Sequence, residues 1–180
     1  MEQIGSVIQD SVLLALPLIV SGSLHMVVVR RDLLPSLKIP LWRAGFGANK
    51  TLRGFVVMPV LTLLGLALTR LVARPELFSF DAVNAWWLGT LLGLSYVLFE
   101  LPNSFLKRRM GIPPGKQAER NRALFFLLDH LDSSTGCAIA YALLLRPPFP
   151  VLLAFWLLAP GIHIAVNLML FALRLRKEPW

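Results

Sequence analysis

Two aspartates, Asp129 and Asp132, lie three residues apart in an otherwise apolar stretch of the chain. On a helix this spacing places both carboxylates on one face, which Ser133 and Gly136 continue. A carboxylate inside a membrane is costly, and two close carboxylates repel each other unless a cation lies between them. The pair therefore predicts either a Mg²⁺ site built from hard oxygen ligands or salt bridges to Lys and Arg side chains. We favour the metal site, because ionisable residues within a membrane are by default functional.

Two short segments, 46–54 and 100–109, combine cations with hydroxyl and amide groups. The first holds two glycines, which allow a ligand to approach the backbone closely, and a polar cluster made of Asn49, Lys50, Thr51 and Arg53. In the second, four polar residues share a helical face if the preceding helix continues, namely Glu100, Asn103, Ser104 and Lys107. Cations in such positions can hold phosphate groups. The alternatives are a turn with anchoring charges and a stop sequence after a membrane span.

The composition points to a membrane protein. Of the 180 residues, 56% are hydrophobic and 16% are charged, and the mean hydropathy is +0.67. Soluble domains carry about 25% charged residues, so this composition excludes a disordered or collagen-like chain and argues against a soluble enzyme. The length predicts a single domain, 1–180. The one cysteine, Cys137, excludes a disulfide framework and a Cys-rich zinc site.

Five stretches are long and apolar enough to cross a bilayer, which takes about 20 residues in a helix. We expect an all-α polytopic membrane protein with transmembrane helices at about 11–29, 54–73, 83–99, 124–145 and 149–173. The fifth span contains Pro160 next to Gly161, a pair that favours a kink. An odd number of spans without an internal repeat argues against a duplicated transporter fold.

Basic residues concentrate on one side of this topology. The predicted loops 30–53 and 100–123 hold six Lys or Arg residues each, and the tail after the fifth span holds three more of the 18. The positive-inside rule then makes both loops and the C-terminus cytoplasmic and puts the N-terminus outside an inner or plasma membrane. Topology thus explains the positive charge, and we expect no nucleic acid as a partner. The two polar segments and the aspartate pair then converge at a site facing the cytoplasm.

These motifs resemble a known enzyme family. Ser104-x-x-Lys107-Arg108, followed by Asp129-x-x-Asp132, is similar to the signature of the CTP-dependent phosphatidate cytidylyltransferases. The likeness is closer to their short branch, the CDP-archaeol synthases, which also show patterns similar to residues 49–54 and 104–112. Members of that branch are similarly small and have five spans. The motif-bearing part of the chain runs from about 46 to 136.

The resemblance implies Mg²⁺-dependent transfer of CMP from CTP to a lipid phosphate, with release of pyrophosphate, as a step of phospholipid biosynthesis. It implies that Asp129 and Asp132 bind the metal and act with Lys107 as catalytic residues. The substrate-binding residues that it implies are Asn49, Lys50, Thr51, Arg53, Ser104, Lys107 and Arg108. The cations among them would hold the triphosphate and the lipid phosphate, whose oxygen would attack the α-phosphorus without a general base, since that oxygen is already ionised.

The chain departs from the family at positions that bear on its substrate. His130 stands where the archaeal branch favours Gln, and the longer bacterial branch has a Glu where Arg53 stands and a His-Gly-Gly run that is absent here. The metal site is intact, but the lipid stays open among archaeol-type ether, diacyl and other isoprenoid or glycerol phosphates. We interpret His25, His130 and His163 as interhelical hydrogen-bonding groups.

The main alternative function is not enzymatic. A small membrane transporter or lipid-binding protein could use the aspartate pair to couple to protons or cations. A CDP-alcohol phosphotransferase is disfavoured, because its Asp-Gly-x-x-Ala-Arg string does not occur in the chain. Many α-helical membrane enzymes dimerise, so a homodimer is open to this protein, although no residue marks an interface.

Overall fold

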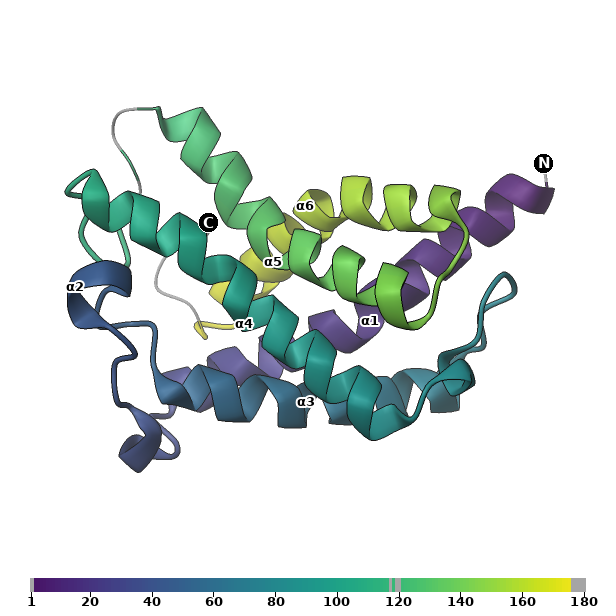
Figure 1. Ribbon diagram of the computed structural model, residues 1–180, viewed down its shortest axis with the longest axis horizontal. Coiled ribbons are helices and arrows are strands. Elements are labelled where there is room, and N and C mark those ends of the chain that lie inside the picture. Colours follow the sequence, from purple (N-terminus) through teal and green to yellow (C-terminus); the bar gives the residue numbers. More distant parts are fainter. Residues whose placement is uncertain (1, 117, 119–120, 176–180) are drawn as a thin grey trace.

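The computed structural model describes residues 2–116, 118 and 121–175. These residues form six α-helices, five of them long, and two short 3-10 helices (Figure 1). The long helices are α1 (Glu2–Arg30), α3 (Leu52–Val72), α4 (Ala85–Arg109), α5 (Arg122–Leu144) and α6 (Phe149–Ala172). The short elements are α2 (Arg43–Phe46) and the 3-10 helices Pro35–Leu37 and Phe80–Ala82.

The expected all-α class is confirmed. Each of the five apolar stretches coincides, within two residues at most, with part of one long helix. Among the described helices, α1, α3 and α6 are long and apolar enough to cross a membrane when length and composition alone are considered. The other two long helices, α4 and α5, carry the polar residues singled out above, and those residues lower their apolar character.

Helix α4 is longer than the apolar stretch that predicted it. It continues through Pro102 to Arg109, so the first ten residues of the expected loop 100–123 are helical. Three cations in its last turn interact favourably with the helix dipole. Gly111 then ends the helix at a φ of +73°, and the amide of Ile112 donates back to the carbonyl of Lys107 at 2.9 Å. This extension puts the polar residues of the segment on a rigid helix.

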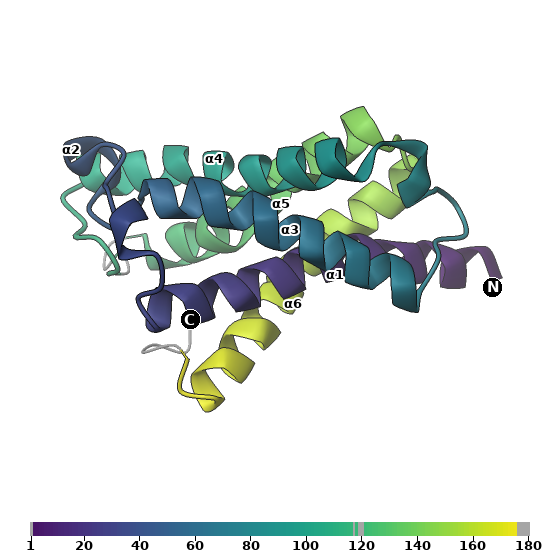
Figure 2. The same ribbon diagram turned by 90° about the horizontal axis from the view of Figure 1, so that it is seen from below.

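The five long helices form a closed ring. Helix α1 packs on α3 and α6, α3 packs on α4, and α5 packs on both α4 and α6. Figure 2 shows the C-terminal part of α6 diverging from the other long helices. The core contains Leu14, Leu66, Leu88, Leu92, Cys137, Tyr141 and Phe155, all at most 1% exposed. The hydroxyl group of Tyr141 donates a 2.8 Å hydrogen bond to the carbonyl of Leu14, which satisfies a buried polar group and ties α5 to α1.

Glycines allow α4 to lie close to both of its neighbours. A Cβ atom built on Gly93 would lie 2.5 Å from the backbone of Pro59 in α3. One built on Gly136 would lie 2.5 Å from the ring of Phe99 and 2.7 Å from the backbone oxygen of Ser95, both in α4. Gly136 lies on the face of α5 that carries the aspartate pair, so this contact sets the distance between that pair and α4.

We expect Gly136→Ala to destabilise the protein by about 1–3 kcal/mol, the typical cost of overpacking. The new methyl group would push α5 away from α4, since the backbone oxygen of Ser95 cannot move aside on its own. The measurement is thermal unfolding in detergent. Gly161→Ala is the matched control, because a Cβ there meets no atom within 4 Å. Equal melting temperatures for the two variants would contradict close packing at Gly136.

Candidate active site

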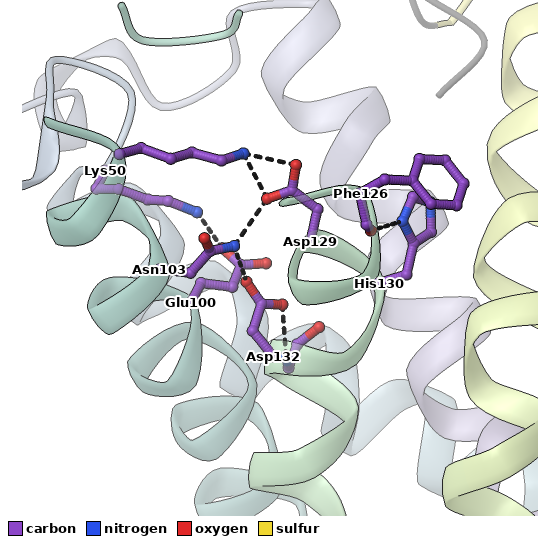
Figure 3. Close-up of polar contacts among 9 residues, drawn as sticks. Lys50, Glu100, Asn103, Phe126, Asp129, His130 and Asp132 are labelled. Atoms are coloured by element: carbon purple, nitrogen blue, oxygen red, sulfur yellow. Dashed lines mark hydrogen bonds and ion pairs between the residues drawn. The ribbon is translucent and has the colours of Figure 1, made fainter. Parts of the chain in front are cut away.

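The carboxylates of Asp129 and Asp132 converge on a single amide group from α4 (Figure 3). The side-chain nitrogen of Asn103 donates to Asp129 Oδ1 at 2.7 Å and to Asp132 Oδ2 at 3.0 Å. Asn103 is buried, so the contact fixes both carboxylates against α4. The three-residue spacing thus places both acids on one face, as the sequence predicts, and that face points toward the polar face of α4.

Among the residues that the structure describes, one member of the pair has a cationic partner. The ammonium group of Lys107 contacts both carboxylate oxygens of Asp129, and 11% of the Lys107 side chain is exposed. Asp132 accepts a 2.6 Å hydrogen bond from the backbone amide of Ser133, and among the described residues it forms no ion pair. The salt-bridge explanation therefore holds for Asp129, whereas the contacts of Asp132 within the described ranges come from the amides of Asn103 and Ser133.

The donor set around the pair suits a hard cation. Besides the two carboxylates, the side-chain oxygen of Asn103 is buried and has no hydrogen-bond partner in the described part of the chain. Rotation of the amide would turn this oxygen toward the acids. No three His, Cys, Asp or Glu side chains of the described residues are close enough to hold a metal by themselves. A Mg²⁺ ion at this pair would therefore complete its coordination with water or phosphate oxygens, as Mg²⁺ commonly does.

A second ion pair lies beside the first. Lys50, from the loop before α3, contacts the Glu100 carboxylate of α4 (Figure 3). Burial lowers the pKa of Lys50, but the carboxylates of Glu100, Asp132 and Asp129 outweigh this effect and raise it, so Lys50 stays charged. Glu100 lies on the helical face that the sequence predicts, although it is absent from the predicted site residues. The three-residue spacing between Glu100 and Asn103 was the sequence signal from which both residues could have been included among the predicted site residues.

A cavity of about 480 Å³ lies next to the aspartate pair. It is lined by α1, α4, α5 and α6, by the loop before α3, and by Gly115 and Lys116. Seven of the nine predicted site residues line it, namely Asn49, Lys50, Ser104, Lys107, Arg108, Asp129 and Asp132. In Arg108, the buried Nε and Nη1 nitrogens find no hydrogen-bond partner within the described ranges. The tertiary structure therefore gathers most of the predicted residues around one space and leaves a guanidinium group there available for an anion.

The other two predicted residues, Thr51 and Arg53, line an adjoining cavity of about 250 Å³. Arg53 Nη1 lies 2.9 Å from Asp32 Oδ1 and 3.1 Å from the carbonyl oxygen of Leu33. Hydrogen bonds from Lys38 and Arg53 lower the pKa of Asp32. This partner holds Arg53 apart from the aspartate pair. Asn49, Lys50 and Glu100 line both cavities, so they form part of the wall between them.

Comparison with known proteins identifies the family of the chain. Residues 42–180 match the family described as CarS-like: CDP-archaeol synthase. The chain belongs to this family. The matched region includes all nine predicted site residues of this CarS-like protein, and helix α1, which forms part of the cavity wall, precedes it.

Three relatives illustrate the similarity, all named CDP-archaeol synthase. The one from Pyrobaculum calidifontis is 35% identical over 136 residues, which cover 75% of this chain and 73% of the relative. The one from Thermofilum pendens is 36% identical over 138 residues, covering 74% and 58%. The one from Methanospirillum hungatei is 30% identical over 141 residues, covering 74% and 80%. No solved structure matches this CarS-like chain.

Proposed function

We propose that the protein is a Mg²⁺-dependent cytidylyltransferase that transfers CMP from CTP to a lipid phosphate and releases pyrophosphate. One observation carries the proposal: a single cavity joins a polar wall to an apolar wall. The α4 and α5 side bears the aspartate pair, Lys107 and Arg108. The α1 and α6 side is largely apolar, with Leu18, Ile19, Met26, Phe155, Ile162 and Val166. Such a space suits a reaction between a charged nucleotide and an amphipathic lipid.

The polar wall supplies the groups that phosphoryl chemistry requires. A triphosphate offers many acceptor oxygens, and Arg108 has two buried donors without partners in the described structure. Lys50 and Lys107 add two more positive charges at the same cavity. Each ammonium group already contacts a carboxylate, which holds the group in position before substrate binds. These three cations would hold the triphosphate and the lipid phosphate near one another.

Asp129 and Asp132 would hold Mg²⁺, with Asn103 as an additional oxygen donor. When bound, the ion would neutralise negative charge on the phosphates that react. The chain itself has few proton transfers to perform, because a phosphate monoester oxygen of the lipid is already ionised at neutral pH. That oxygen attacks the α-phosphorus of CTP and pyrophosphate leaves. Lys107 and Arg108 would bind the reacting and departing phosphates and offset the charge that develops on them.

All five long helices would cross the membrane, with the N-terminus outside and the cavity facing the cytoplasm. Helices α4 and α5 can do so because their charged residues line the cavity, apart from Arg109 and Arg122 at the helix ends. CTP would enter from the cytoplasm, and the lipid would lie against the apolar wall formed by α1 and α6. The names of the relatives favour an archaeol-type ether lipid as the acceptor.

Transfer of label from CTP to lipid tests the proposal. The purified protein in detergent would receive Mg²⁺, CTP labelled at the α-phosphate, and either archaeol-type ether or diacyl lipid phosphates. We expect label in the lipid fraction, most with the ether lipid, and none when EDTA removes the metal. If folded protein transfers no label to any lipid phosphate, the enzymatic proposal is wrong, and the transporter or lipid-binding alternative replaces it.

A further inference from the structure

The adjoining cavity of about 250 Å³ is the space that the proposed chemistry leaves without a role. Three polar residues line this cavity and not the main one, namely Lys38, Thr51 and Arg53. The contact between Lys50 and Glu100 lies in the wall that the two cavities share (Figure 3). Within the described part of the chain, no residue of α5 or α6 lines the adjoining cavity. It therefore lies apart from the aspartate pair of α5 and from the apolar surface of α6.

Arg53 is a buried cation of this cavity. The residue is 5% exposed. Its Nη1 nitrogen donates to Asp32 Oδ1 at 2.9 Å and to the carbonyl oxygen of Leu33 at 3.1 Å. Its Nε nitrogen is buried and has no hydrogen-bond partner among the described residues. A buried N–H group of a guanidinium ion is costly to leave unpaired, so the site favours a ligand that offers oxygen acceptors.

Lys38 shares the carboxylate that Arg53 uses. Its Nζ nitrogen lies 3.0 Å from Asp32 Oδ1 and 3.1 Å from Oδ2, and both side chains of this pair are more than half exposed. Asp32 is not part of the cavity lining, whereas both of its cations are. Because exposed ion pairs are weak, an anion inside the cavity can replace Asp32 as the partner of these two cations.

The start of α3 adds a partial positive charge to the same cavity. Thr51 and Gly54 line the cavity on either side of Leu52, the first residue of the helix. The hydroxyl group of Thr51 does not cap the helix. The amide of Leu52 donates at 2.9 Å to the carbonyl oxygen of Ile39, which fixes the position of this helix end. A helix N-terminus beside Lys and Arg side chains favours an anion, and phosphate groups in particular.

We propose that the adjoining cavity binds the terminal phosphate of the nucleoside triphosphate and holds that end of the pyrophosphate product. The inference rests on the proposed function, because it assigns one end of the nucleotide in that reaction. The lipid phosphate is joined to apolar chains and stays beside the apolar wall, so the nucleotide supplies the phosphate that reaches this far. The α- and β-phosphates lie at Lys107 and Arg108 in the main cavity, and the γ-phosphate lies beyond Lys50, at Arg53 and Lys38. When the lipid oxygen bonds to the α-phosphorus, the bond to the bridging oxygen breaks and its electron pair leaves with pyrophosphate, whose added charge these cations offset.

The test measures KM for CTP and the inhibition constants of pyrophosphate and CDP, at constant free Mg²⁺, in the wild-type protein and in Arg53→Gln. CDP lacks the terminal phosphate, so its inhibition constant reports the binding of the rest of the nucleotide. We expect Arg53→Gln to raise KM for CTP and the inhibition constant of pyrophosphate at least about tenfold, the effect of losing a hydrogen bond between charged groups. The inhibition constant of CDP and KM for the lipid phosphate should not change. Partial unfolding lowers kcat and leaves all of these constants where they are.

Asp32→Asn should change the binding of pyrophosphate in the opposite direction. Arg53 and Lys38 then lose the carboxylate that competes for them, so we expect the inhibition constant of pyrophosphate to fall about two- to fivefold, the size expected of an exposed ion pair. Residue 32 has a φ of +47°, a left-handed conformation that asparagine also adopts, so the loop keeps its backbone. Asp81→Asn is the matched control, because Asp81 is an exposed carboxylate outside the lining of both cavities.

The outcomes separate the two proposals. If the wild-type protein turns over no CTP with any lipid phosphate, the proposed function fails, and this inference fails with it. If it turns over CTP but Arg53→Gln leaves the constants for CTP and pyrophosphate unchanged, the cavity assignment is wrong while the proposed function stands. An equal rise for CDP, or a rise of KM for the lipid phosphate instead, would also overturn the assignment to the terminal phosphate. A rise for CTP and pyrophosphate alone, with stronger inhibition by pyrophosphate in Asp32→Asn, supports the inference.

Discussion

Asp132→Asn is expected to lower kcat/KM for CMP transfer by about 10³-fold or more, equivalent to about 4 kcal/mol of transition-state stabilisation. Asp132 is the carboxylate of the pair that forms no ion pair in the described structure, so it is the acid most dependent on a metal ion for charge compensation. Asparagine keeps the size but only one of the two oxygens that accept from Asn103 and from the Ser133 amide, and it removes the charge that would bind Mg²⁺. Label transfer from CTP to lipid measures the loss.

Stability measurements separate a lost metal site from a damaged fold. Without Mg²⁺, we expect Asp132→Asn to be about as stable as the wild-type protein, because removal of the repulsion between the two carboxylates offsets the loss of one hydrogen-bond acceptor. Addition of Mg²⁺ should raise the melting temperature of the wild-type protein and leave that of the variant unchanged. Asp81→Asn is a matched control, since Asp81 is an exposed carboxylate outside the cavity lining. Full activity in Asp132→Asn would rule out a catalytic metal held by this residue.

Lys107→Gln is expected to lower kcat/KM by about 10²–10³-fold, the typical effect of losing one group that stabilises charge in the transition state. Lys107 lines the cavity and pairs with Asp129, so the change also leaves a partly buried carboxylate without its cation. The variant should therefore melt at a lower temperature than the wild-type protein. Activity with CTP and thermal unfolding in detergent measure the two effects.

The double variant Lys107→Gln with Asp129→Asn distinguishes the role of Lys107 in pairing with Asp129 from its role in binding phosphate. It replaces the ion pair by two amides, so we expect it to recover most of the stability lost in Lys107→Gln but none of the activity. Arg109→Gln is the matched control: it removes a neighbouring cation of the same helical turn that stacks on Phe105 and does not line the cavity. If Arg109→Gln is as inactive as Lys107→Gln, the effect comes from the net charge at the end of α4, and the assigned role of Lys107 is wrong.

Much of this fold follows from local properties of the sequence. An apolar stretch of about 20 residues favours a helix wherever it lies, since its backbone polar groups are satisfied within the segment. The five stretches accordingly coincide with five long helices. The end of α4 was less predictable, because Pro102 and a run of cations suggested a loop. In the structure the residues from Pro102 to Arg109 are still helical, and Gly111 ends the helix.

The sequence alone also determined which side chains share a face within one helix. Helical periodicity sets this relation, so the spacing of Asp129 and Asp132, or of Glu100, Asn103 and Lys107, placed each group together before any packing was known. What periodicity cannot supply is the rotation of one helix about its axis relative to the next. That rotation depends on close contacts such as Gly136 against Ser95, which turn the acidic face of α5 toward the polar face of α4.

Only the tertiary structure decided which partner each charged residue takes. Lys50 and Arg53 are three residues apart in one cationic segment, yet Lys50 contacts Glu100 at the main cavity and Arg53 pairs with Asp32 in the adjoining one. The physical reason is that several carboxylates lie within reach of a long side chain in this segment, and the path of the loop backbone decides which of them the side chain contacts.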